Sequence, residues 1–153
     1  MRGATMDRQQ MRQALEGAVL EVLETMCFEF PVAEPEQGPG PENDAVRAAA
    51  RFEGSLRGVL HVALTGEAPR RLAAAFLGLE ESQVGGQEML QMASELANMV
   101  CGAAMSRLEP HGRLRISPPE ADRGGPLCQD GCWLHFPLES GEVAATLICE
   151  DKS

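Results

Sequence analysis

Tyrosine is absent from this sequence, and other aromatic residues are few, with one tryptophan and five phenylalanines among 153 residues. Hydrophobic residues still make up 44% of the chain, so a core can form, but it must be built from aliphatic side chains. The length is typical of one ordinary domain. We therefore predict a single domain over residues 1–153 with an aliphatic core.

Basic residues are also scarce. The chain has 13 lysines and arginines against 23 acidic residues, which gives a formal net charge of -10. Such a surface repels the phosphates of nucleic acids and the headgroups of anionic lipids. We therefore expect no nucleic-acid partner, while binding to a protein that carries a phosphate group remains open.

Long apolar runs are missing too, because none approaches the roughly 18 residues that a membrane-spanning helix needs. The N-terminal segment places Asp7 and Arg8 where a secretion signal would have its apolar stretch. We expect a cytoplasmic protein that does not enter the membrane.

The cysteines are odd in number and scattered, which is typical of reduced thiols in the cytosol. They are Cys27, Cys101, Cys128, Cys132 and Cys149. Cys128 and Cys132 frame a turn with His135 nearby, but a metal site would need more ligands at matched spacing. We therefore predict that this chain binds no metal and no cofactor of its own. Serine-nucleophile and phosphate-loop motifs are also absent.

Helical periodicity is clearest in two long segments, residues 7–26 and residues 87–108. Asp7 is expected to cap the first helix, since its carboxylate can accept hydrogen bonds from the first turn. A shorter helix is predicted over residues 67–77, ending at Gly78.

Strand-like segments are rich in β-branched or other apolar residues and are bounded by glycine or proline. They cover residues 46–53, 59–65, 114–117, 132–138 and 143–150. Short connections favour antiparallel pairing, so we predict an α+β fold, a mostly antiparallel sheet with helices packed on it. No regular structure is expected in the flexible acidic, Pro/Gly-rich loop at about 32–44 or in the polar loop at about 120–130.

The long helix over residues 87–108 separates into two faces when its residues are placed 100° apart. The face expected in the core holds Met89, Met92, Ala93, Leu96, Val100, Ala103 and Ala104, and the opposite face holds Gln91, Glu95, Asn98, Gly102 and Met105. Glu95 and Asn98 are three residues apart, so their side chains are neighbours that can point at a partner together. Wheel geometry alone does not separate this from an ordinary solvated face.

Two further features of this helix favour a binding surface. Gly102 costs about 1 kcal/mol of helix propensity relative to alanine, and its small size would let another protein approach the backbone closely. Met99 and Met105 are flexible side chains of the kind used at binding surfaces. Arg107, near the core stripe at the helix end, is expected to run its stem along the surface and bind nothing.

The segment from Ser94 to Ala104 resembles the helix motif of the CheX/CheC/FliY family of chemotaxis phosphatases. That motif has a glutamate, two residues, an asparagine, an apolar pair and then a small residue. The proline-bearing segment at residues 116–119, the hairpin at residues 132–150 and the first helix at residues 20–26 are also similar to the family.

The resemblance implies a function. Family members dephosphorylate the aspartyl phosphate of CheY-like receiver domains. Asn98 would orient the attacking water, and Glu95 would pair with a lysine of the receiver, which would supply the Mg²⁺. Gln91, Met99, Gly102 and Met105 would complete the partner-binding surface.

The resemblance is to the CheX branch in particular, because CheC-type members carry two such sites. The first helix offers Glu16 and Glu21 without an asparagine three residues later. CheX-like proteins are dimeric through sheet edges, which implies a homodimer whose edge could be the terminal hairpin strand.

Two alternatives stay open. A CheX-like interaction module without catalysis would suit Gln91, which stands where the family has an acidic residue or serine, and the shortened spacing from Asn98 to Pro118. A flagellar-switch adaptor related to FliY is a third reading, although the sequence offers no second domain for motor assembly.

Overall fold

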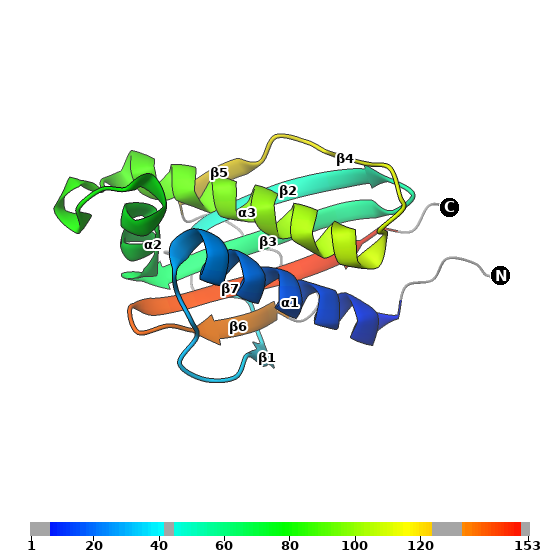
Figure 1. Ribbon diagram of the computed structural model, residues 1–153, viewed down its shortest axis with the longest axis horizontal. Coiled ribbons are helices and arrows are strands. Elements are labelled where there is room, and N and C mark those ends of the chain that lie inside the picture. The colour runs from blue at the N-terminus through cyan, green and yellow to red at the C-terminus, as the bar shows by residue number, and fades with distance from the viewer. Residues whose placement is uncertain (1–6, 42–44, 124–132, 151–153) are drawn as a thin grey trace.

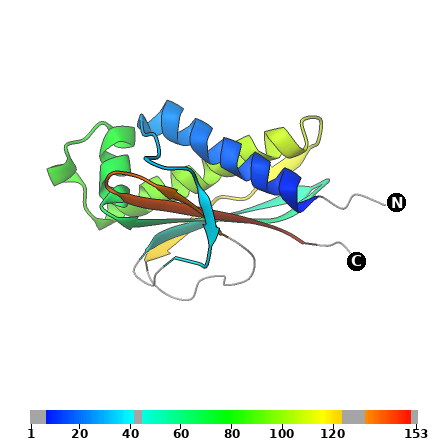
Figure 2. The ribbon, with the colours of Figure 1, turned by 90° about the horizontal axis from the view of Figure 1, so that it is seen from below.

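The computed structural model of the chain describes residues 7–41, 45–123 and 133–150. Its strands form one seven-stranded sheet, and its helices lie together on one face of that sheet (Figures 1 and 2). The helices are α1 (Arg8–Cys27), α2 (Ala68–Leu77) and α3 (Gly86–Leu108), with the short 3-10 helix η1 (Glu81–Gln83) between the last two. The strands are β1 (Glu36–Gly38), β2 (Val46–Gly54), β3 (Arg57–Gly66), β4 (Leu114–Ile116), β5 (Glu120–Arg123), β6 (Trp133–Pro137) and β7 (Gly141–Cys149).

The sheet has the strand order β1-β6-β7-β3-β2-β4, and β5 pairs with β2 beside β4. Every pairing is antiparallel. The predicted α+β class, with an antiparallel sheet and helices packed on it, is therefore confirmed.

Local sequence signals start and stop the helices as expected. The Asp7 carboxylate accepts a hydrogen bond from the Gln9 backbone N–H at 3.0 Å, which caps α1. Gly78 ends α2 in the left-handed conformation, with φ 70°. At the start of α3, the Glu88 carboxylate accepts from the Gly85 N–H at 2.8 Å.

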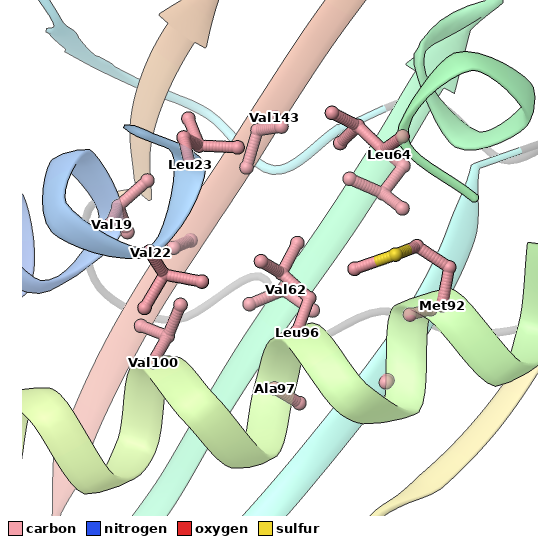
Figure 3. Close-up of a cluster of buried hydrophobic side chains, with 14 of the residues drawn as sticks. Val19, Val22, Leu23, Val62, Leu64, Met92, Leu96, Ala97, Val100 and Val143 are labelled. Carbon is pink, nitrogen blue, oxygen red and sulfur yellow. The ribbon is translucent and has the colours of Figure 1, made fainter. Parts of the chain in front are cut away.

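The core lies between the helices and the sheet, and most of its side chains are aliphatic, with Phe52 and Phe136 also buried in it. Strand β3 turns Leu60, Val62 and Leu64 toward the helices, and all three are fully buried. Leu96 of α3 lies above them and is also fully buried (Figure 3). The helix that carries the candidate site therefore rests on a close-packed base, and such packing resists displacement.

The expectation of no regular structure at about residues 32–44 is wrong at Glu36–Gly38, which forms strand β1 against β6. His135 of β6 accounts for much of this attachment. Its Nε2 lies 2.7 Å from the Pro39 carbonyl oxygen, and its Nδ1 lies 2.7 Å from the Glu142 carboxylate. A three-residue strand that is held by contacts with β6 is too short to show the alternation of apolar and polar residues by which strands are predicted.

The polar segment expected over residues 120–130 also contains a strand, β5. Strand β2 is nine residues long and pairs with β4 at one end and with β5 at the other. Pro118 and Pro119 fall between these two partners, because proline has no N–H to continue the ladder. The rest of that expected loop, with Cys128, lies outside the described residues, and so does Cys132.

The idea that the terminal hairpin supplies a sheet edge is wrong. Strand β7 lies between β3 and β6, and β6 is itself covered by β1. Within the described residues, the edges of the sheet are β1 on one side and β4 with β5 on the other. No helix in this part of the chain is long and apolar enough to span a membrane.

Candidate functional site

Helix α3 is two-faced, as the sequence predicts. Its buried residues are Met89, Met92, Ala93, Leu96, Ala97, Val100, Cys101, Ala104 and Met105. Ala103, expected in the core, is only half-buried, since it lies at the boundary with α1. The buried stripe fixes the rotation of the helix, and the rotation determines which side chains face outward.

Gln91 and Asn98 are exposed on the outer face of α3, and Glu95 between them is half-buried. On a helix, residues three apart have Cβ atoms about 5–6 Å from one another, so Glu95 and Asn98 form a neighbouring pair. Neither side chain forms a hydrogen bond or ion pair with any residue that the structure describes. Both groups are thus available to a partner.

Gly102 lies one turn beyond Asn98 and has no packing role in the fold. A Cβ atom built at Gly102 meets nothing within 4 Å. At Gly17 of α1, by contrast, a Cβ would come within 2.9 Å of Arg107 Nε. The glycine of α3 is therefore not required by the interior, which is consistent with close approach by another protein.

Met105 was predicted on the outer face, and this placement is wrong, because only 3% of it is exposed. The C-terminal part of α3 is flanked by β4 as well as by the centre of the sheet (Figure 1), so its buried arc is wider than one stripe. Met99 is half-buried and packs against the core, so only part of it faces outward.

The expectation that Arg107 binds nothing is wrong, because this residue joins α3 to α1. Its guanidinium lies 2.7 Å from the Glu21 carboxylate and donates to the Ala103 carbonyl oxygen at 3.2 Å. The side chain crosses Gly17, which leaves room for it. Because Glu21 is engaged in this ion pair and has no asparagine three residues later, α1 carries no second Glu-Asn pair.

The described thiols are poor nucleophiles. Burial raises the pKa of Cys27 and of Cys101 to about 11, with Glu29 adding to the effect at Cys27, and burial also raises the pKa of Cys149. All three remain protonated near neutral pH. Among the residues that the structure describes, no group of three potential ligands gathers where it could hold a metal ion.

His61 is remote from α3, on the opposite face of the sheet. Its ring centroid lies 6.1 Å from that of Trp133. Burial lowers its pKa, and the charges of Arg51 and Arg47 lower it further. A neutral imidazole packed against an indole is a structural arrangement.

The site therefore consists of an amide and a carboxylate, presented side by side on a rigid helix beside an open glycine. Such a pair has no covalent chemistry to offer, but it can position a water molecule and a cationic side chain.

The family model described as chemotaxis phosphatase CheX matches residues 46–131, more than half of the chain. The chain belongs to the CheX family. The matched stretch contains the whole of α3, and with it both Glu95 and Asn98. A search of curated proteins found no match.

Solved structures of CheX and CheC-like proteins share the fold. A CheC-like superfamily protein from Shewanella sp. PV-4 has a TM-score of 0.76 at 17% identity, covering 95% of this chain and 100% of its own. CheX from Vibrio vulnificus has a TM-score of 0.73 at 19% identity, with the same coverage of both chains. A CheX–CheY–BeF3–Mg²⁺ complex from Borrelia burgdorferi has a TM-score of 0.70 at 19% identity, covering 92% of this chain and 98% of that one.

Proposed function

We propose that this CheX-family chain is an aspartyl-phosphate phosphatase that acts on the phosphorylated receiver domain of a CheY-like response regulator. The observation that carries the proposal is the outward-facing pair of Glu95 and Asn98, one turn apart on α3 and unengaged by any described residue. The partner class is supported by the Borrelia burgdorferi structure, in which a CheX of the same fold is bound to CheY with BeF3 and Mg²⁺.

The proposed roles follow from charge. Phosphoryl transfer depends mainly on positioning and electrostatic stabilisation, with little covalent work for the protein. The Asn98 amide orients the attacking water without placing a negative charge beside the phosphate. The Glu95 carboxylate pairs with a lysine of the receiver, which aligns the two proteins. Mg²⁺ bound by the receiver would balance the charge on the phosphoryl group.

The rest of the contact surface is proposed along the same outer face of α3. Gln91 lies one turn before Glu95 and is exposed. Gly102 leaves the backbone open beyond Asn98. The exposed part of Met99 completes this surface.

The proposal is tested by following the decay of phosphorylated receiver domains in Mg²⁺, alone and with this protein. Candidate receivers come from the same genome. Wild-type protein is expected to accelerate the decay, and Asn98→Ala is expected to lose about 100-fold of that acceleration, since a misplacement of about 1 Å at the reacting centre can cost about 10²-fold. Gln87→Ala is the matched control, an exposed amide on the same helix about 16 Å from Asn98. Full activity in Asn98→Ala would rule out the proposed mechanism.

The same experiment addresses the non-catalytic alternative. If a receiver binds the wild-type protein and its phosphate lifetime stays unchanged, the chain is an interaction module and not a phosphatase. The exposed amide of Gln91, at the position where an acidic residue or serine is expected, is the feature that motivates this second candidate.

We further propose that the chain forms a homodimer, with β1 or the β4–β5 side in place of the terminal hairpin as the sheet edge involved. Light scattering coupled to size exclusion measures the mass in solution. A mass of one chain at all accessible concentrations would rule the dimer out.

A further inference from the structure

Among the described residues, the large hydrophobic side chains that are clearly exposed all belong to one short segment, residues 26–32. The exposed fractions are 40% for Met26, 74% for Phe28, 66% for Phe30 and 61% for Val32. Single exposed apolar residues are ordinary, but a cluster of them marks a binding surface. We call residues 26–32 the apolar segment.

Phe28 is one of these exposed residues, although its backbone conformation is one that disfavours phenylalanine. It is the one non-glycine residue with positive φ in the described chain, at φ 57° and ψ 39°. This left-handed position ends α1, and glycine is the residue that such a position prefers. Packing does not explain the phenylalanine, because its ring is mostly exposed. A strained residue without an internal role is a reason to look for an external one.

The apolar segment is anchored to the body of the protein. Arg71 of α2 lies 3.2 Å from the carboxylate of Glu29, whose side chain is only 12% exposed. The Val32 N–H donates to the Pro137 carbonyl oxygen at 2.8 Å. The exposed rings therefore project from fixed backbone, which lowers the entropy lost when a partner binds.

The apolar segment lies beside the Glu95–Asn98 pair. Helices α1 and α3 are adjacent and antiparallel (Figure 1), and the Glu21–Arg107 ion pair beside Ala103 fixes their alignment. From Glu21 to Phe28 the rise is about 10 Å, and from Ala103 back to Asn98 and Glu95 it is about 8–12 Å. Both rises start at the Glu21–Arg107 ion pair and run in the same direction along the two helix axes. Phe28 is therefore level with the Glu95–Asn98 pair on the neighbouring helix.

A shallow groove extends the apolar segment toward α2. It has a volume of about 400 Å³ and is bordered by Phe28, Arg71, Ala75, Leu79 and Glu80, among others. A groove of this size can accept one apolar side chain from a partner, and its acidic border favours a basic residue beside that side chain.

Charge is the property that indicates which partner binds the apolar segment. This chain carries a net charge of -10, so its field opposes the approach of an anionic phosphoryl group. Apolar burial close to the site offsets that repulsion, together with basic residues of the partner placed against the exposed Glu24 and Glu80. A phosphorylated receiver needs these contacts to overcome the electrostatic repulsion, whereas an unrelated apolar ligand does not.

We propose that the apolar segment docks the same receiver domain whose phosphate faces Asn98, through an apolar patch of the receiver with a basic rim. The inference rests on the proposed function. It assigns to Phe28 and Phe30 the role of affinity contacts, separate from the positioning role of Asn98.

The test uses Phe28→Gly, which removes the ring and suits the left-handed backbone, so the protein is expected to stay folded and to lose no thermal stability. Affinity is measured by calorimetry with a candidate receiver carrying beryllofluoride and Mg²⁺, which mimics the phosphorylated state without turnover. We expect Phe28→Gly to weaken binding at least about tenfold, the range of a central aromatic contact. Phe28→Tyr keeps the ring on the same backbone and is the matched control, expected to bind within about twofold of wild type.

The outcomes separate this inference from the proposed function. If Phe28→Gly binds as wild type while Asn98→Ala loses turnover, docking by the apolar segment is wrong and the phosphatase stands. If Phe28→Gly weakens binding while Asn98→Ala keeps turnover, docking stands and the catalytic role is wrong. If no receiver binds, both are overturned; a drop in self-association of Phe28→Gly would then assign the segment to a second copy of the chain.

Discussion

Gly102 and Gly17 offer a matched pair of substitutions in which the same chemical change meets two different surroundings. Each glycine lies inside a helix, where replacing glycine with alanine gains about 1 kcal/mol of helix propensity. At Gly102 the new Cβ meets no atom within 4 Å, so the whole gain should appear in the free energy of unfolding. At Gly17 the Cβ comes within 2.9 Å of Arg107 Nε, and the guanidinium has to move away from Glu21.

We expect Gly102→Ala to raise the free energy of unfolding by about 1 kcal/mol and the melting temperature by about 2–4 °C. Gly17→Ala should raise the free energy of unfolding by less, because displacing the ion pair offsets part of the gain in helix propensity. The offset is small, since an exposed ion pair contributes at most about 1 kcal/mol. Urea unfolding followed by circular dichroism measures both changes. A loss of stability in Gly102→Ala would refute the reasoning, since it would mean that the backbone at Gly102 is not open. If the proposed receiver contact is right, the same stabilised variant should also bind the receiver less well.

Leu96→Ala should lower the free energy of unfolding by about 2–5 kcal/mol, because the side chain is fully buried above β3; urea unfolding checks this, and a change under about 1 kcal/mol would contradict the packing. His135→Ala should release β1, since both ring nitrogens lose their partners at 2.7 Å; hydrogen exchange at residues 36–38 should quicken while α3 is unchanged. Cys27 and Cys101 keep their protons in the folded state until the pH nears 11, whereas the unfolded thiols ionise near pH 9. Stability should therefore fall between these pH values by up to about 1.4 kcal/mol per pH unit for each thiol, and an unfolding free energy that stays flat there would count against their burial.

Periodic elements could be predicted from the sequence because burial imposes a repeat on them. Helix α3 shows this best: its apolar stripe placed Glu95 and Asn98 on the outer side, and the structure leaves both side chains accessible. The same reasoning failed for Met105, because a wheel assumes one buried side and cannot know that β4 flanks the end of the helix.

Strands β1 and β5 were missed for a related reason. Both are short, and their partners lie far away in the sequence, so nothing in their own residues signals pairing. The apolar segment was missed as well, because Phe28 and Phe30 look like ordinary core residues at the end of an amphipathic helix. Only the left-handed turn at Phe28 sends these rings outward, and a phenylalanine is not a residue that predicts such a turn.

The two prolines between β4 and β5 have a consequence for the behaviour of the protein at high concentration. An open sheet edge is a template on which identical chains can add strand after strand, the first step of fibril formation. Here that side of the sheet is divided by Pro118 and Pro119 into strands of three and four residues, and the other side ends in a strand of three. In the part of the chain that the structure describes, neither margin provides the six- or seven-residue uninterrupted ladder on which ordered aggregates grow. The short edge strands thus disfavour polymerisation of the protein. They do so without lysines along the sheet edges, of which this acidic chain has few.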